Sequence, residues 1–454
     1  MNGSQWFGHP RGLSTLFFTE MWERFSYYGM RAFLILYMTA AVANGGLGFD
    51  DKHAATVYGN YVGAVWLTPI AGGFIADRLL GQYRSVLLGG SIIALGHFAL
   101  AFKTLSTFYA GLVLIVIGTG LLKPNVSTIV GSLYEDGDAR RDAGFSMFYM
   151  GINLGAFIGP IIAGGLAQKV NWHLGFAMAG IGMVAGLVQY VLGKPELEPG
   201  LARLAAQRPL RQRLSFSLSR MLRSILRLPL TLWEWLKSFT PQERGRMAVI
   251  VVLFVFASVF WGAYEQAGST LNLFGDRYTD NRVFGLAYPS SWYVSVQALF
   301  VILLSPAFAW LWLKLGPRQP SVPSKFALAL LFGGVAFLLL VPAGVMAQSA
   351  AGIKVSPLWL VAAYFIEEWG ELCLSPVGLS AVTKLAPKRI VSLMMGVFFL
   401  SNSLGNKLAG WTAGFFSSMP LSKLFGAVAA VCLVAAVIMF ALVKPVKRMM
   451  GGVT

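Results

Sequence analysis

The stretch Glu20-Met-Trp-Glu23-Arg24-Phe25-Ser26-Tyr27-Tyr28-Gly29-Met30-Arg31 lies inside an apolar segment, with Leu13 to Phe18 before it and Ala32 to Met38 after it. Six of its side chains recur at offsets that share one face of an α-helix: Glu20, Glu23, Arg24, Tyr27, Tyr28 and Arg31. Each charge at membrane depth costs about 2.5–3.5 kcal/mol, so such groups normally face a bundle interior or a wet cavity. A structural pair between Glu20 and Arg24 would explain only part of this stripe.

The composition is that of a polytopic helical membrane protein. The 454 residues are 56% hydrophobic and 12% charged, whereas soluble proteins carry about twice that fraction of charge. A membrane-spanning helix needs about 20 apolar residues. We predict twelve spans, at residues 13–40, 55–76, 85–103, 107–130, 144–167, 174–193, 245–270, 291–315, 323–347, 357–383, 391–416 and 421–444.

Cysteine and histidine usage indicates neither a disulfide framework nor a metal site. Cys373 and Cys432 both fall inside apolar spans, and the four histidines show no metal-ligand spacing. We therefore expect no metal and no cofactor, with carboxylates as the proton carriers. The N-terminal leader runs directly into a full-length span, so we expect no cleavable signal peptide.

The net charge of +17 is a topology signal rather than a sign of nucleic-acid binding. Basic residues concentrate in the loops after even-numbered spans and in the C-terminal tail, for example Arg78, Arg84, Arg140 and Arg448. The positive-inside rule then places both termini in the cytoplasm of a cell whose inner membrane holds the protein. Besides membrane lipid we expect no macromolecular partner, and a monomer.

Two groups of six spans, residues 1–195 and 244–454, flank a connector at residues 196–243. Between Arg203 and Arg227 the connector holds seven arginines and no acid, with apolar residues at helical spacing. This pattern predicts either an amphipathic helix on the anionic inner leaflet or a solvated linker. This organisation resembles the major facilitator superfamily, whose substrate site lies between the two halves. The segment from Gly73 to Arg84 resembles that superfamily's loop signature between spans 2 and 3.

Five local motifs resemble those of the proton-dependent oligopeptide transporters, in family order along the chain. They are Glu20 to Tyr28 (E-x-x-E-R-F-x-Y-Y), Leu122 to Ser127, Phe148 to Gly155 (F-Y-x-x-I-N-x-G), Tyr264 to Gln266 and Gly370 to Ser380. The resemblance implies uptake of di- and tripeptides with protons by alternating access, and no enzymatic activity.

The resemblance also implies residue roles. Glu20, Glu23 and Arg24 would form a proton-coupling cluster, to which Glu265 and Glu371 also contribute. Lys123 with Glu371, and Arg31 with Glu265, would form salt bridges between the two halves, switched by protonation and by the peptide. Glu371 would bind the peptide amino group, and Arg31 and Lys123 its carboxylate. The further residues assigned to the substrate pocket are Tyr27, Tyr28, Trp66, Asn153, Gln297 and Ser375.

Physical chemistry supports such a pocket, because a peptide zwitterion enters a low-dielectric cavity only if both ends meet opposite charge or hydrogen-bond partners. Local alternatives remain for three residues. Lys123, next to Pro124, would instead extend to the membrane surface. Glu265 would pair locally or cap its helix, and Asn153 would form only an interhelical hydrogen bond.

The sequence departs from the family pattern at several positions. Trp66 replaces a tyrosine, Gln297 stands in place of an Asn-Pro pair, Phe398 replaces a tryptophan, and Gly59 occupies the site of a histidine found in animal relatives. Glu367 and Glu368 add carboxylates one turn before Glu371; we expect Glu367 to line the cavity and Glu368 to face a neighbouring helix. The two additional spans of many bacterial relatives are not evident.

The sequence therefore predicts a proton-coupled peptide symporter. The nearest alternative is the same fold carrying another anion, such as nitrate. A second is a sensor that binds peptide and signals through the connector, although no signalling domain is recognisable there. A membrane enzyme is disfavoured, because the sequence holds no metal cluster, nucleophile elbow or phosphate loop.

Overall fold

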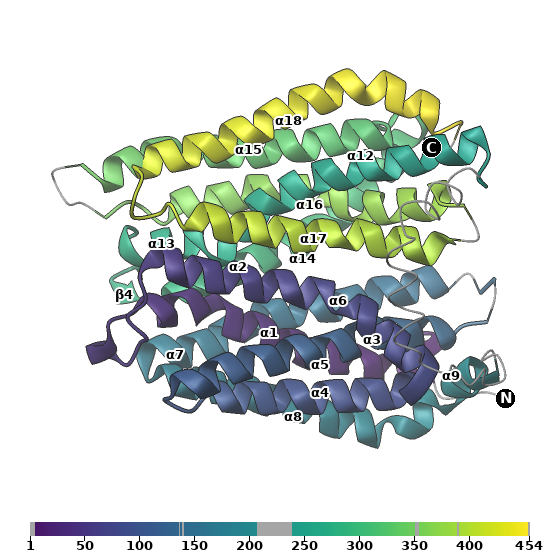
Figure 1. Ribbon diagram of the computed structural model, residues 1–454, viewed down its shortest axis with the longest axis horizontal. Helices are drawn as coiled ribbons and strands as arrows, with labels where there is room; N and C mark the ends of the chain where they lie inside the picture. The colour runs from purple at the N-terminus through teal and green to yellow at the C-terminus, as the bar shows by residue number, and fades with distance from the viewer. Residues whose placement is uncertain are drawn as a thin grey trace, which may run out of the picture.

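The computed structural model describes residues 5–135, 137, 138, 140–206, 238–349, 354–387 and 390–452. Long helices running side by side make up most of it (Figure 1). In the first half they are α1 (Gly12–Thr39), α2 (Asp51–Leu67), α3 (Pro69–Ile75), α4 (Gln82–Leu100), α5 (Leu105–Ser132), α6 (Arg141–Gly159), α7 (Gly165–Lys169), α8 (Trp172–Leu192) and α9 (Lys194–Ala206). In the second half they are α12 (Pro241–Tyr264), α13 (Thr270–Arg277), α14 (Tyr293–Leu315), α15 (Val322–Ala347), α16 (Leu358–Leu385), α17 (Val391–Ala413) and α18 (Leu421–Met449).

Short elements join the helices. Single turns of π-helix continue α3 and α6: η2 (Ala76–Leu80) and η3 (Pro160–Gly164). The short 3₁₀ turns are η1 (Val42–Asn44), η4 (Glu265–Gly268), η5 (Ser290–Trp292) and η6 (Gly316–Arg318). Two hairpins of two-residue strands complete the described chain: β1 (Gln5–Trp6) with β2 (His9–Pro10), and β3 (Arg282–Val283) with β4 (Leu286–Ala287).

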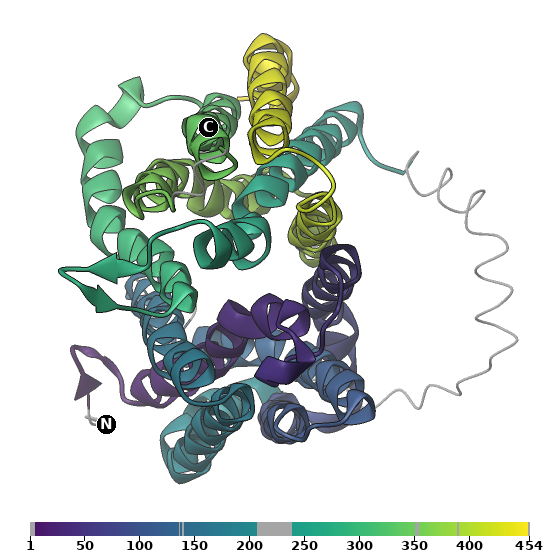
Figure 2. The same ribbon diagram turned by 90° about the vertical axis from the view of Figure 1, so that its left-hand side faces the viewer.

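The helices form two bundles, one purple to blue and the other green to yellow (Figures 1 and 2). In the first, α1 packs on α6 and α8, and α4 on α5; in the second, α15 packs on α16 and α18, and α12 on α17. The bundles meet where α2 packs on α17 and α6 on α14. Every one of the twelve predicted spans coincides with a helix or a helix pair. The central part of the predicted connector, residues 207–237, lies outside the described residues, so its helix stays a prediction.

Eight helical runs in the described residues are long and apolar enough to cross a membrane by length and composition alone. The four other predicted spans fall short for physical reasons. Helix α1 carries the charged stripe, α16 holds three glutamates, and α17 includes Lys407 and several amides and hydroxyls. Helix α2 has only 17 residues before the chain continues as α3 at Pro69.

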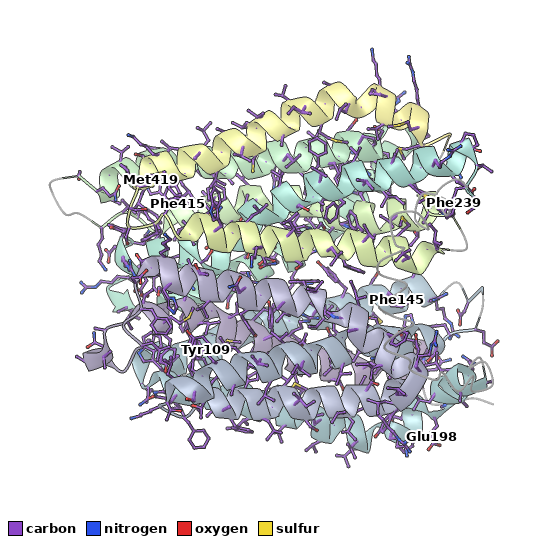
Figure 3. All side chains as sticks on the ribbon, in the orientation of Figure 1. Tyr109, Phe145, Glu198, Phe239, Phe415 and Met419 are labelled. Carbon is purple, nitrogen blue, oxygen red and sulfur yellow. The ribbon has the colours of Figure 1, made fainter. Side chains whose placement is uncertain are left out.

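The outer surface of both bundles is apolar along the length of the helices. Side chains such as Leu95, Leu313 and Val437 are 60%, 83% and 68% exposed, and hydrocarbon side chains project from the outer helices in Figure 3. An exposed apolar belt of this extent is expected where lipid replaces water as the solvent.

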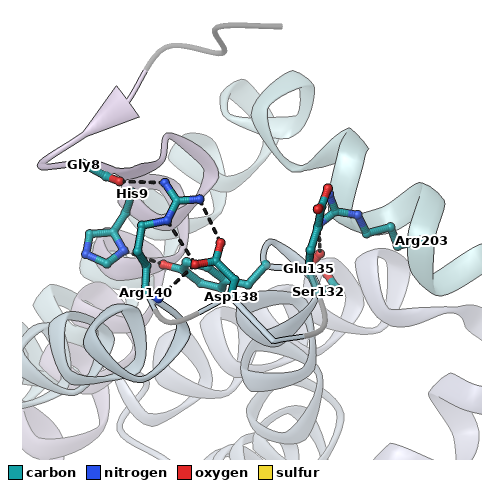
Figure 4. Close-up of polar contacts among 8 residues, drawn as sticks. Gly8, His9, Ser132, Glu135, Asp138, Arg140 and Arg203 are labelled. Carbon is teal, nitrogen blue, oxygen red and sulfur yellow. Dashed lines mark hydrogen bonds and ion pairs between the residues drawn. The ribbon is translucent and has the colours of Figure 1, made fainter.

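Both chain termini lie at one end of the molecule, called here the terminus side; the β3–β4 hairpin marks the opposite end, the hairpin side (Figure 1). On the terminus side, Arg140 donates hydrogen bonds to the Asp138 carboxylate and to the Gly8 carbonyl, at 2.8 and 3.0 Å (Figure 4). The hydrogen bonds from Arg140 lower the pKa of Asp138 to about 2. Arg203 of α9 binds Glu135 nearby, at 3.1 Å. These contacts tie the loop between α5 and α6 to the N-terminal hairpin and to α9.

On the hairpin side, α2 and α17 approach until their backbones touch. A Cβ added to Gly410 would lie 2.5 Å from the Gly59 Cα, and one added to Gly59 would lie 2.9 Å from the Gly410 Cα. The glycine predicted to replace a histidine therefore has a packing function in this chain. Asp51 at the start of α2 also forms a bidentate ion pair with Arg277 of α13, with both N–O distances 2.7 Å.

The seventh predicted span differs from the structure at its hairpin-side end. The apolar run predicts a helix ending at residue 270, but after η4 the chain turns at Ser269 and continues as α13 to Arg277. The sequence from Thr270 to Arg277 is too polar to be predicted as part of a span, because this helix is buried against α1 of the other bundle and against its own bundle instead of facing lipid. In contrast, α5 runs without interruption through Pro124.

We predict that Gly410→Val separates the bundles on the hairpin side, because its side chain has no space beside Gly59. Spin labels at Ala43 and Leu286, on opposite bundles, should show a longer mean distance in this variant. Gly396→Val is the matched control on the same helix, since nothing lies within 4 Å of a Cβ there. Equal label distances in the two variants would show that the glycine contact does not hold the bundles together.

Candidate functional site

The charged stripe of α1 faces the inside of the first bundle. Glu20, Glu23 and Arg24 are between 1% and 4% exposed. The Arg24 guanidinium lies 2.8 Å from a Glu20 oxygen and 3.1 Å from a Glu23 oxygen. The predicted cluster is therefore formed, with two carboxylates sharing one cation.

A row of glycines on α6 makes room for this cluster. A Cβ at Gly151, Gly155 or Gly159 would lie 2.9, 2.2 or 2.5 Å from a backbone carbonyl of α1. These residues are four apart, so they share one face of α6 and form a smooth groove for α1. The close packing of the two helices keeps water away from Glu23 and Arg24.

The predicted ion pair between Arg31 and Glu265 is present. Arg31 of α1 binds Glu265 of η4 through a guanidinium nitrogen, and its Nε donates to the Tyr58 hydroxyl of α2 at 2.6 Å. Both charged side chains are nearly buried. Because α1 and η4 belong to different bundles, this pair joins them at membrane depth.

The predicted ion pair between Lys123 and Glu371 is not formed in the described structure. The Lys123 ammonium lies 3.0 Å from the centroid of the Trp66 ring and has no hydrogen-bond partner among the described residues. An indole face attracts a desolvated ammonium strongly. In this structure the tryptophan that replaces the family's tyrosine thus holds the lysine on its own bundle, and the pair of Lys123 with Glu371 stays a prediction for other states of the protein.

Glu371 is bound instead by hydroxyl groups from both bundles. Its carboxylate accepts hydrogen bonds from Ser375 at 3.3 Å, from Tyr264 of α12 at 3.4 Å and from Tyr149 of α6 at 3.4 Å. Three neutral donors around a carboxylate leave it open to exchange partners, because each contributes less than a cation would. Glu371 therefore lies at the interface of the bundles without an ion-pair partner in the described residues.

The remaining predicted pocket residues occupy separate positions around these groups. Tyr27 and Tyr28 place their rings about Arg31, at 6.0 and 5.8 Å from ring centroid to guanidinium carbon. Gln297 of α14 donates to Glu367 at 3.4 Å. Asn153 donates to the Tyr149 carbonyl of its own helix at 3.0 Å. This hydrogen bond lies within one helix, so it is not the interhelical hydrogen bond considered as the alternative to a pocket role.

Three tyrosines of the site were not among the predicted residues: Tyr58, Tyr149 and Tyr264. Tyr149 lies in the motif from Phe148 to Gly155, and Tyr264 begins the motif from Tyr264 to Gln266. Membership of these motifs is the sequence feature that could have indicated them as site residues. Tyr58 contacts Arg31 from a helix on which the sequence shows no charged or polar stripe, so nothing local indicated it.

Polar contacts close the hairpin side of the interface around the site. Gln168 donates to Asp276 at 3.2 Å and to Ser290 at 2.8 Å, across the two bundles. Together with the bidentate pair of Asp51 and Arg277, these bonds lie between the Arg31–Glu265 pair and the hairpin-side surface. The site is thus shielded from that side by charged and amide groups.

The sequence profile described as the POT family matches residues 83–198 and 223–431. This chain belongs to the POT family. It is 42% identical to the uncharacterized transporter YclF of Bacillus subtilis, over 98% of this chain and 96% of that protein. It is 38% identical to the peptide transporter YePEPT of Yersinia enterocolitica, over 99% and 97% of the two chains. A di-/tripeptide transporter of Lactococcus lactis is 37% identical, with 98% of each chain covered.

Solved structures of POT family proteins share the fold. A crystal structure of a mutant of the peptide transporter POT in complex with alafosfalin superposes with a TM-score of 0.88 and 40% identity, over 99% of this chain and 97% of the other. The predicted family and the major facilitator fold are therefore confirmed. The similar proteins are transporters, so this POT protein is a transporter and not an enzyme.

We predict that breaking the Arg31–Glu265 pair lowers the free energy of unfolding of this POT protein far more than breaking an exposed pair does. Arg31→Ala or Glu265→Ala leaves a buried charge without a partner and should cost about 3–5 kcal/mol, with the double variant costing less than the sum. The measurement is unfolding in lipid–detergent micelles. Arg11→Ala, which breaks the more exposed pair with Glu196, should cost about 1 kcal/mol or less. Equal losses at the two pairs would contradict the assignment.

Proposed function

We propose that this protein imports di- and tripeptides together with protons across the inner membrane by alternating access. The observation that carries the proposal is a set of buried charges of both signs, contributed by both bundles: the α1 cluster and Lys123 in the first bundle, the Arg31–Glu265 pair between the bundles, and Glu371. The names of the relatives from Yersinia and Lactococcus support peptide as the substrate class.

The two ends of a peptide match the charges of this site. A peptide carries an ammonium and a carboxylate, and neither enters a low-dielectric cavity without a partner. Glu371, which has neutral donors and no cation as ion-pair partner among the described residues, would receive the ammonium. Lys123, whose ammonium lies on the Trp66 ring and forms no ion pair among those residues, and Arg31 would receive the carboxylate. Because Glu371 and Lys123 belong to different bundles, a bound peptide would draw the bundles together.

Protons would enter through the carboxylates. A proton on Glu20 or Glu23 would remove one negative charge from the α1 cluster, and a proton on Glu265 would remove one half of the inter-bundle pair with Arg31. The second change would weaken a contact that holds the two bundles together. Proton and peptide affinity then depend on each other through linkage.

Charge placement supports a cytoplasmic terminus side. That end carries the arginines of the first and second even-numbered loops, including Arg78, Arg84 and Arg140, and the basic end of α18. The hairpin side carries fewer cations, and several of them are accompanied by Asp51, Asp276 or Asp280. By the positive-inside rule the hairpin side would face the periplasm or the exterior. The bonds that close this side would then make the structure an inward-facing one.

We predict that external dialanine acidifies the lumen of sealed liposomes that contain only this protein, under an inside-negative potential. A pH-sensitive dye in the lumen measures the response. Glu371→Gln and Lys123→Ala should abolish it, because each removes a partner of the peptide. If protein that is shown to be correctly inserted gives no acidification, dialanine is not a proton-coupled substrate. The same assay with tripeptides and with nitrate then tests the alternative substrates, and flux of any of them in pure liposomes excludes a mere sensor.

We predict that Glu20→Gln and Glu23→Gln uncouple transport from the proton gradient while sparing exchange. Proton-driven accumulation of labelled dialanine should fall to near background, whereas exchange of internal for external peptide, which needs no net proton release, should continue. Glu371→Gln is the comparison, since it should impair both activities. Full accumulation by Glu23→Gln would remove Glu23 from the coupling role.

A further inference from the structure

Helix α16 carries three carboxyl groups within five residues, and two of them have no place in the mechanism above. Glu367 and Glu368 are 1% and 0% exposed, and Glu371 is 6% exposed. Among the described residues, no lysine, arginine or histidine forms an ion pair with any of the three. Three adjacent carboxyl groups without a cation cannot all be ionised inside a membrane protein.

Glu368 and Glu371 interact directly. Their side chains are within hydrogen-bonding distance of each other, and the Tyr264 hydroxyl lies 2.9 Å from an oxygen of Glu368 and 3.4 Å from an oxygen of Glu371. A hydrogen bond between two carboxyl groups requires a proton on one of them. The pair therefore shares at least one proton.

The surroundings favour Glu368 as the protonated partner. Glu371 receives hydrogen bonds from Tyr149 and Ser375 and shares the single hydroxyl proton of Tyr264 with Glu368, and donors of this kind stabilise a carboxylate. Among the described residues Glu368 has Tyr264 as its only hydroxyl donor, and its second oxygen has no hydrogen-bond partner. A buried carboxyl group with so little support stays neutral, and a neutral acid is a hydrogen-bond donor.

The charged and titratable groups around the triad come from every neighbouring element. They are Tyr264 of α12, Glu265 of η4, Tyr149 of α6, Tyr28 of α1, Cys432 of α18, Tyr364 and Cys373 of α16 itself, and Lys325 of α15, which faces Cys373. From α14 the neighbour is the neutral Gln297. Lys407, the lysine of α17, is bound to Asn60 of α2 instead. Apart from Lys325, which faces Cys373, these groups add no positive charge near the triad.

We propose that Glu368 stays protonated throughout the transport cycle and donates a hydrogen bond to the Glu371 carboxylate, which fixes how acidic the medium must become before Glu371 loses its charge. Glu368 is a positioning residue, because it acts through Glu371 and not on the peptide. The inference rests on the proposed function, in which ionised Glu371 binds the peptide amino group. Its role would extend peptide binding into more acidic conditions.

The test is the pH profile of dialanine affinity, measured by calorimetry on the full-length protein in lipid nanodiscs. Affinity should fall on the acidic side as Glu371 gains a proton. Glu368→Leu removes the donor and should move this acidic midpoint up by about one pH unit, which weakens binding about tenfold on the acidic limb. Glu368→Gln keeps an N–H donor in the same place, so it should retain the midpoint and also proton-driven uptake. A merely structural role would not move the midpoint.

Glu367→Leu is the matched control, because Glu367 has no hydrogen bond to Glu371 in the described structure, and it should leave the midpoint unchanged. An unmoved midpoint in Glu368→Leu overturns the inference. So does loss of proton-driven uptake with retained exchange in Glu368→Gln, since Glu368 would then release its proton during the cycle. If Glu368→Leu does not fold, Glu368→Met replaces it, and if neither folds the Glu368→Gln result decides. Absence of dialanine binding to the unaltered protein at every pH overturns the proposed function and this inference with it.

Discussion

A guanidinium and a carboxylate removed from water keep their charges only while they stay together, and Arg31 and Glu265 come from different bundles. The rest of the site is arranged around this constraint. Tyr58 supports the guanidinium from α2, and the chain of the seventh span leaves its helical path at η4, where Glu265 lies. Any motion that separates the bundles on the hairpin side must provide new partners for both charges, or a proton for Glu265. In the proposed transport cycle, conformational change and protonation would therefore be linked at this pair.

Most of the fold follows from hydropathy, since twelve apolar runs predict the positions of the helices within a few residues. The differences occur where burial against protein replaces burial in lipid. Helix α13 packs against α1 and against its own bundle instead of lipid, so its polar sequence does not predict part of a span. The break between α2 and α3 at Thr68 lies inside an apolar run that reads as one continuous span. Local patterns report the environment of a residue, but they do not report which partner provides that environment.

The same distinction applies to the site. The stripe on α1 and its pairing with Arg24 were predictable, because the partners are neighbours on one helix. The pair of Arg31 with Glu265 was predicted from a family resemblance and not from spacing. The position of Lys123 was not predictable, since two residues that are far apart in sequence, Trp66 and Glu371, compete for its ammonium. The outcome depends on a few ångströms of backbone placement, which no local pattern encodes.

The contact of Gly59 with Gly410 lies near one end of the long helix α17. Helix α17 extends from Gly410 to Val391 on the terminus side, a length of about 28 Å at the rise of an α-helix. Because the backbones touch near one end, a rotation of about 10° about that point displaces the other end by about 5 Å. A side chain at either glycine would move the two helix backbones apart at this contact. In the proposed alternating-access cycle, the close contact of these two glycines would therefore let a small change of helix angle displace the terminus-side end of α17 by this amount.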